Sequence, residues 1–163
     1  MTMRTLLIAA ALGMLALIAG AFAFDCHRLA LQARSRVELA DQELRKHEQR
    51  LVKVLSVSPA LTPDVQFAIT IYEGSSQPPL RHTAYDKLVA AFQKTMQAEL
   101  DPADPLARKF MDDVAGALNR REIAEKSYDA EIAAYHDYMS GLRGAVVNWF
   151  SPPAGAQAEE AAR

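Results

Sequence analysis

The sequence contains a single cysteine, Cys26, and has little net charge. One thiol excludes an internal disulfide framework and a cysteine-based zinc site. With 18 basic against 20 acidic residues the net charge is −2, so the chain lacks the basic excess that is typical of nucleic-acid-binding proteins. We therefore expect no nucleic-acid partner.

The chain also lacks the short motifs that mark common catalytic sites. It has no G-x-S-x-G, no P-loop and no G-x-G-x-x-G, and its four histidines form no His-x3-His, His-Glu-x-x-His or Glu-x-x-His pattern. A carboxylate cluster over residues 122–131 has Arg121 and Lys126 at four-residue spacing from Glu125 and Glu122, which is typical of a solvated helix face. The sequence predicts a protein that is not an enzyme and holds neither a metal nor another cofactor.

What the chain does have is an apolar leader followed by a charged body. Half of the 163 residues are hydrophobic, which is too many for a disordered chain, and the length suits one domain. Arg4 is the only charged side chain before Asp25, and every acidic residue lies at or after Asp25. We expect an anchor over residues 1–24, a folded body over 25–150 and a disordered tail over 151–163.

The leader is long enough to cross a bilayer as a helix. Residues 6–24 form an uncharged run of 19. At about 1.5 Å per residue the run reaches roughly 28 Å, close to the thickness of about 30 Å of a hydrocarbon core. The sequence therefore predicts a single-pass membrane protein.

A cleaved signal peptide is the alternative reading of the leader. Ala21-Phe22-Ala23 is a small-x-small site, and cleavage after Ala23 would release an exported soluble bundle that binds a ligand or partner. Basic residues flank the run on both sides, so the side of the membrane that holds the body stays undetermined.

Two long stretches of the body predict long helices. Neither glycine nor proline occurs from Ala21 to Ser58, so the anchor helix should continue unbroken into the body. Thr62-Pro63 predicts the start of a short helix over 63–73, another helix is expected over 83–100, and Asp104-Pro105 predicts the start of a helix over 105–140. Residues 75–79 are expected to be a loop and 142–150 a short apolar segment. A seam at helical spacing faces other helices and comprises Ala33, Val37, Ala40, Leu44, His47, Leu51 and Val54. We predict an all-α fold, in which an N-terminal transmembrane helix continues into an antiparallel bundle of three to four long helices.

One set of residues resembles the signature of the LemA family. Asn119-Arg120 is followed nine residues after Asn119 by Tyr128-Asp129, and seven residues later by Tyr135-His136. The spacing matches the family's Asn-Arg and Tyr-Asn pairs, while Asp129 and His136 replace asparagine. The family's Phe-Pro after this run is absent, and its Tyr-Pro-Asp-Leu loop is reduced to residues 101–106.

The resemblance implies a divergent LemA-type protein of a bacterial membrane, with an N-terminal membrane helix and a bundle of long helices. It supplies no catalytic residues. We expect a non-catalytic interaction or scaffold module whose partner is another membrane protein or a second copy of itself. Packing or interaction roles are expected for Asn119, Arg120, Tyr128 and Tyr135. Exposed apolar surface is expected for Val146, Val147, Trp149 and Phe150. Trp149-Phe150 is a candidate partner site; an isolated pair of this kind more often closes the end of a bundle, and a membrane-interface anchor is the alternative.

Overall fold

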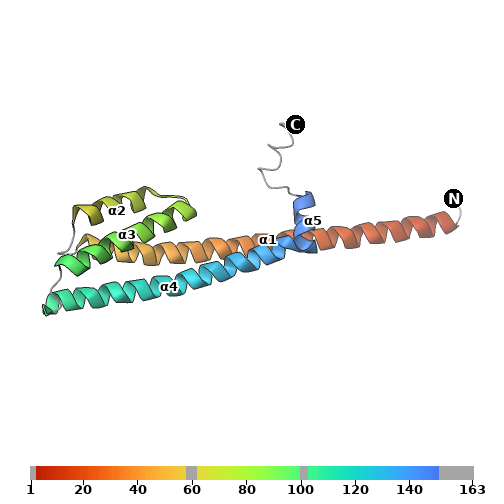
Figure 1. Cartoon of the computed structure of the whole chain (residues 1–163). Helices are drawn as coiled ribbons and strands as arrows, with labels where there is room; N and C mark the ends of the chain where they lie inside the picture. The colour runs from red at the N-terminus through yellow and green to blue at the C-terminus, as the bar shows by residue number, and fades with distance from the viewer. Residues whose placement is uncertain (1–2, 58–61, 100–102, 151–163) are drawn as a thin grey trace, which may run out of the picture. The chain divides into compact units, whose positions relative to one another are not determined.

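The computed structural model describes residues 3–57, 62–99 and 103–150, and these residues form five α-helices and no strand (Figure 1). The all-α prediction is therefore confirmed. The predicted tail over 151–163 lies outside the described residues. The helices are α1 (Met3–Ser56), α2 (Pro63–Gly74), α3 (Pro78–Glu99), α4 (Pro105–Ser140) and α5 (Leu142–Phe150).

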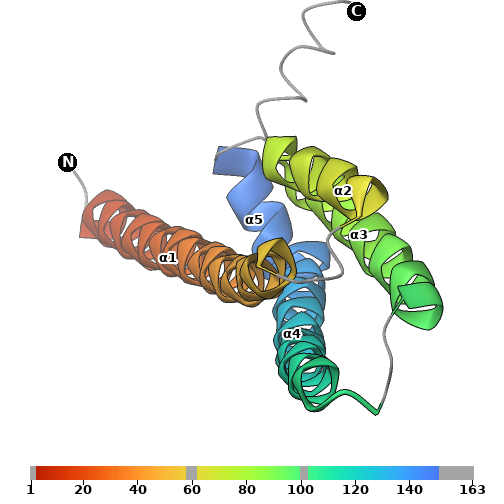
Figure 2. The same cartoon turned by 90° about the vertical axis from the view of Figure 1, so that its left-hand side faces the viewer.

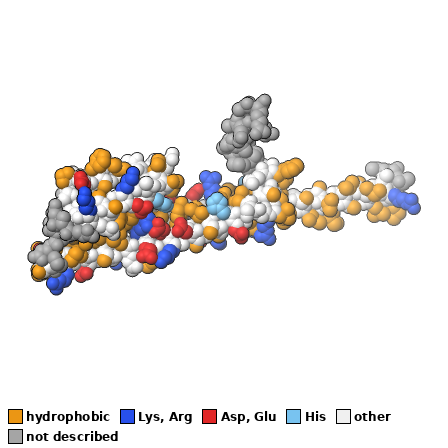
Figure 3. All heavy atoms as spheres, in the orientation of Figure 1, with side chains coloured by type: hydrophobic (Ala, Val, Ile, Leu, Met, Phe, Trp, Pro, Cys, Tyr) orange, Lys and Arg blue, Asp and Glu red, His pale blue; other side chains and the backbone are white. Residues whose placement is uncertain are grey.

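Helix α1 is 54 residues long and runs from the leader into the body without a break, as predicted. No proline interrupts its hydrogen-bond ladder. Its apolar N-terminal segment is long and apolar enough to cross a membrane, and no residue of that segment's most apolar window is buried. Figure 3 shows hydrophobic side chains along the visible face of this segment.

The shorter helices begin where proline and a capping side chain permit. At the start of α2, Thr62 accepts a 3.5 Å hydrogen bond from the amide of Val65, and Pro63 occupies the first turn, as predicted. Before α4, Asp104 accepts a 2.9 Å hydrogen bond from the amide of Leu106.

The predicted start of α3 was wrong. The helix begins at Pro78 rather than Thr83, so the connection from α2 is shorter than the expected loop over 75–79. Two adjacent prolines resemble a loop in the sequence. The first four amides of a helix have no intrahelical acceptor, however, so prolines in the first turn remove no hydrogen bond.

The described residues divide into two compact units, and Leu39–Tyr128 is the first. In it, successive helices run antiparallel, and both views show α2 and α3 side by side (Figures 1 and 2). All four helices contribute to one apolar core, which confirms the predicted helical bundle. The core consists of Leu51, Val52 and Leu55 from α1, Val65, Ala68, Ile69 and Tyr72 from α2, Ala84, Tyr85, Leu88 and Phe92 from α3, and Val114 and Ala117 from α4.

The second unit combines the described parts of 1–38 and 129–163, namely the first part of α1, the end of α4, and α5. Its small core joins Cys26 and Ala30 of α1 to Val147 of α5. Tyr138 of α4 packs against this core, and its hydroxyl donates a 2.7 Å hydrogen bond to the carbonyl of Cys26. Helix α5 is thereby held against α1 just after the apolar leader.

Candidate functional site

The structure distributes the residues that the sequence singled out over both units. In the first unit, Asn119 and Arg120 are exposed on α4, and Tyr128 is half-buried. The ring of Tyr128 makes an edge contact with the ring of His82, with centroids 5.5 Å apart. Asn119 and Arg120 are thus on exposed parts of α4, whereas Tyr128 contacts α3.

The other three lie in the second unit. Tyr135 is half-buried and lines a cleft of about 230 Å³ beside Arg36 and Arg143. Trp149 and Phe150 are strongly exposed at the end of α5, where they line an apolar hollow. Val147, expected to be exposed, is instead buried against Cys26, because it lies on the opposite face of α5.

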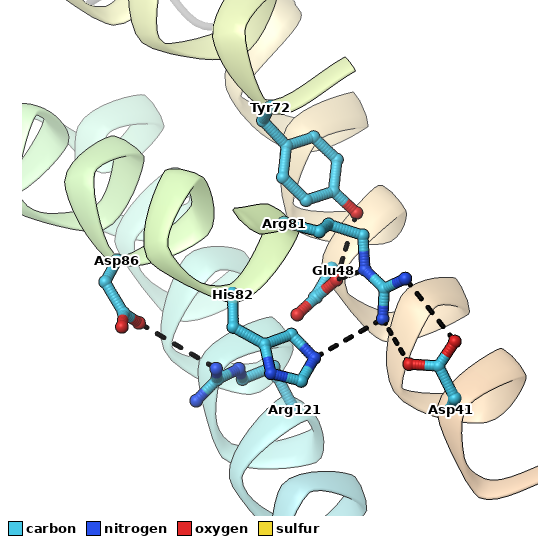
Figure 4. A network of polar contacts seen from close by, with 7 residues as sticks. All are labelled: Asp41, Glu48, Tyr72, Arg81, His82, Asp86 and Arg121. Carbon is cyan, nitrogen blue, oxygen red and sulfur yellow. Dashed lines mark hydrogen bonds and ion pairs between the residues drawn. The ribbon is translucent and has the colours of Figure 1, made fainter. Parts of the chain in front are cut away.

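A buried polar network that the sequence analysis missed lies inside the first unit (Figure 4). Its centre is Arg81 of α3, which is 2% exposed, and its main partner is Glu48 of α1, which is 0% exposed. Charged side chains are almost never buried this completely unless they are paired. The burial of both partners therefore marks this network as the most unusual feature of the bundle.

Arg81 is held by two carboxylates of α1. Its Nε donates a 2.9 Å hydrogen bond to Glu48, and its two terminal nitrogens donate to both oxygens of Asp41, at 2.5 and 3.4 Å. The Tyr72 hydroxyl of α2 donates to the same Glu48 oxygen at 3.2 Å. The network thus links α1, α2 and α3 through charge-assisted hydrogen bonds.

A second cation lies beside this network. Arg121 of α4 forms ion pairs with Glu125 and, at 3.8 Å, with Asp86 of α3. Its guanidinium carbon lies 4.7 Å from the centroid of the Tyr85 ring, a cation–π contact. Through Tyr85 and Asp86, Arg121 connects α4 to α3.

Burial and hydrogen bonding together determine the protonation states of the network. Burial acts to lower the pKa of Arg81, but its hydrogen bonds to Asp41 and Glu48 outweigh this effect and raise the pKa above its usual value. Burial, reinforced by the Glu48 carboxylate, raises the pKa of Tyr72, and burial also raises that of Tyr85 against the opposing charge of Arg121. Arg81 therefore stays cationic and both tyrosines stay neutral at physiological pH.

Three buried polar atoms of this region have no hydrogen-bond partner among the described residues. They are Oε1 of Glu48, the hydroxyl of Tyr85 and Nε of Arg121. The Glu48 oxygen is an acceptor, the Tyr85 hydroxyl can donate and accept, and the Arg121 nitrogen is a donor. Each could therefore hydrogen-bond to water or to one of the others. An unsatisfied buried polar atom costs about 1–3 kcal/mol, so these atoms are where the network can tolerate least change.

The hydrogen bonds of the Arg81 side chain go to partners within the bundle. Arg81 donates three hydrogen bonds to the carboxylates of Asp41 and Glu48. In the described parts of the chain, no group of three or more His, Cys, Asp or Glu side chains is placed to hold a metal ion. The arrangement is suited to fixing the register of three helices.

The sequence did contain a signal for the network. Glu48 follows Leu44 by four residues and precedes Leu51 by three, so it lies on the same face of α1 as these two buried leucines. Arg81 likewise precedes Ala84 and Leu88 of the buried face of α3. A charge in an apolar stripe predicts a buried partner of opposite sign.

A shallow hollow of about 430 Å³ lies on the outer side of α2 and α3. The exposed side chains of Phe67 and Ile71 line it from α2, and those of Lys87 and Lys94 line it from α3. Its lining combines apolar surface with these two lysines and one carboxylate, that of Asp64.

Comparisons of the chain with protein-family models, with curated proteins and with solved structures found no match.

Proposed function

We propose that this chain is a membrane-anchored helical bundle of the LemA type that acts as a non-catalytic protein-interaction module in a bacterial membrane. The observation that carries the proposal is the apolar segment of α1. This segment is exposed around its whole circumference and continues without a break into the bundle. A helix that is apolar all round is stable when lipid or protein covers it.

The interior of the bundle supports a non-catalytic role. Its most unusual charged residues, Arg81 and Glu48, neutralise each other out of reach of solvent. Their geometry links helices, which is what a rigid scaffold requires. The spacing of Asn119, Tyr128 and Tyr135, which resembles the LemA signature, also supports this proposal.

We assign the partner-binding surface to the hollow on α2 and α3. Phe67 and Ile71 are four residues apart on α2, so they present one apolar strip, and Lys87 and Lys94 flank it on α3. An amphipathic helix that lays its apolar face in such a groove and places acidic residues beside the lysines would be complementary. The proposed occupant is therefore an acidic amphipathic helix of another membrane protein.

The anchor is tested by fractionating cells that express the tagged full-length chain, with intact-mass analysis and protease added from outside. Full-length mass in the membrane fraction is the expected result, and the protease then identifies the side that holds the body. A soluble species that begins at Phe24 would replace this proposal with the exported-bundle alternative.

The partner surface is tested by crosslinking through a photoreactive residue at position 67, in the compartment that the first experiment identifies. We expect one crosslinked membrane protein, lost in Ile71→Ser. The matched control is Leu106→Ser, which changes an exposed leucine of α4 outside the hollow and should leave crosslinking intact. Equal crosslinking in both variants would refute the assigned surface, and a crosslink to a second copy of this chain would replace the proposed partner.

A further inference from the structure

Helix α5 has one buried face and one strongly exposed apolar face. Gly144 and Val147 are buried, and Val147 packs on Cys26 and Ala30 of α1. Leu142, Trp149 and Phe150 are 77%, 84% and 68% exposed. Large apolar side chains gathered on one short helix indicate a surface that something covers.

The position of α5 along α1 indicates what covers it. The uncharged run ends at Phe24, so Cys26 lies about 3 Å and Ala30 about 9 Å beyond its end at 1.5 Å per residue. The polar layer on each side of a bilayer is roughly 5–8 Å deep, which is half the difference between the total thickness of about 40–45 Å and the hydrocarbon thickness of about 30 Å. In a bilayer that α1 crosses, Cys26 would therefore lie within the lipid headgroup layer and Ala30 at its outer edge.

The direction and charge of α5 agree with this level. Figure 1 shows α5 standing steeply across α1, so it would lie near the plane of a bilayer that α1 crosses. The helix contains one basic residue, Arg143, and no acidic residue. A cationic side chain beside tryptophan and phenylalanine is the composition that favours the boundary between headgroups and acyl chains.

We propose that α5 is an interfacial helix, which inserts Trp149 and Phe150 into the headgroup–acyl boundary of the bilayer that α1 spans. This inference rests on the proposed membrane anchor. A free helix of nine residues would bind lipid weakly, but the anchor holds α5 at the surface and makes its insertion an intramolecular step. The second unit then has two membrane contacts, one spanning and one interfacial.

The experiment uses the full chain in vesicles of phosphatidylcholine and phosphatidylglycerol, because Trp149 is the only tryptophan and its fluorescence reports α5 alone. One vesicle set carries bromine near the carbonyl end of the acyl chains, and a second carries it near the methyl end. We expect blue-shifted emission, stronger quenching by the shallow bromines than by the deep ones, and protection from aqueous iodide.

The matched control carries Trp149→Phe together with Ser35→Trp. Ser35 is exposed on α1 in the same unit, about 16 Å beyond Phe24 and hence past the headgroup layer. Its tryptophan should be quenched by iodide and not by brominated lipid. This pair of results separates lipid contact of α5 from general proximity to the vesicle.

Flotation of the vesicles separates the two proposals. A chain that does not float with vesicles refutes the membrane anchor. If the chain floats, and Trp149 is quenched by iodide but not by brominated lipid, the interfacial helix is refuted and the membrane anchor is retained. Protection of Trp149 from iodide and bromine alike would also refute it, since a second copy of the chain would then cover α5.

Discussion

Replacement of Arg81 by methionine tests whether the buried network holds the bundle together. Methionine keeps much of the aliphatic volume but removes the cation and its three hydrogen bonds to Asp41 and Glu48. The Glu48 carboxylate, which is 0% exposed, then retains only the Tyr72 hydroxyl as a donor among the described residues. The variant therefore leaves a buried charge without its counterion.

The expected cost is large for a domain of this size. Removing one partner of a buried ion pair destabilises by about 3–5 kcal/mol, because the other charge stays desolvated. Domain stabilities are typically about 5–15 kcal/mol, so the variant should lose a large share of the total. Arg81→Met/Glu48→Met removes the orphaned charge as well, and we expect it to recover about 1–3 kcal/mol of the loss.

The measurement is urea unfolding of the full chain in mild detergent, followed by circular dichroism. The matched control is Lys46→Met, which also removes a cation. Lys46 forms an exposed ion pair with Glu43 at 3.4 Å, and both residues lie on α1. Exposed pairs contribute little, so the control should change the free energy of unfolding by no more than about 0.5 kcal/mol.

Two results would refute the reasoning. If Arg81→Met were as stable as Lys46→Met, the network would contribute no more than a surface pair. If Arg81→Met were strongly destabilised but Glu48→Met recovered nothing, the loss would come from packing rather than from an uncompensated Glu48 carboxylate.

Three further predictions concern other parts of the chain. The pKa values of Tyr72 and Tyr85 are raised in the folded protein, so the unfolded chain loses these protons first. Their contribution to stability should be constant below pH about 10 and fall above it, so urea midpoints should decrease in alkaline solution. Gly144→Ala should weaken the docking of α5 by about 1–3 kcal/mol, because the added Cβ would collide with the α4 backbone. Gly141→Ala meets only ordinary contacts at 3.7 Å and should be near neutral, with Trp149 fluorescence during urea unfolding as the readout for both. Thr62→Ala should cost about 1 kcal/mol through loss of the α2 cap, measured by the same unfolding followed by circular dichroism.

Much of the fold could be predicted because its causes are local. The continuity of α1 follows from the absence of glycine and proline between residues 21 and 58, and the start of α2 follows from Thr62 and Pro63. The start of α3 was missed because Pro78-Pro79 fits a loop and a first helical turn equally well. Tertiary packing of Arg81, three residues later, favours the helix.

The buried network could not be derived in the same way. Glu48 and Arg81 are 33 residues apart, and Asp41 and Arg81 are 40 apart. The predicted seam included His47 rather than Glu48, and Arg81 lay before the predicted start of its helix, so neither residue was identified as buried. That pairing depends on how α3 is rotated and shifted against α1, which no single residue encodes.

The sequence by itself determined the helical periods, most of the caps and breaks, and the uncharged run that continues into the body, because these depend on neighbours within a few residues. Only the tertiary structure decided that Arg81 joins both carboxylates of α1, and that α5 buries Val147 while exposing Trp149. The physical reason is that helix formation is satisfied within one segment. Which face each helix buries is chosen by the packing of all the segments together.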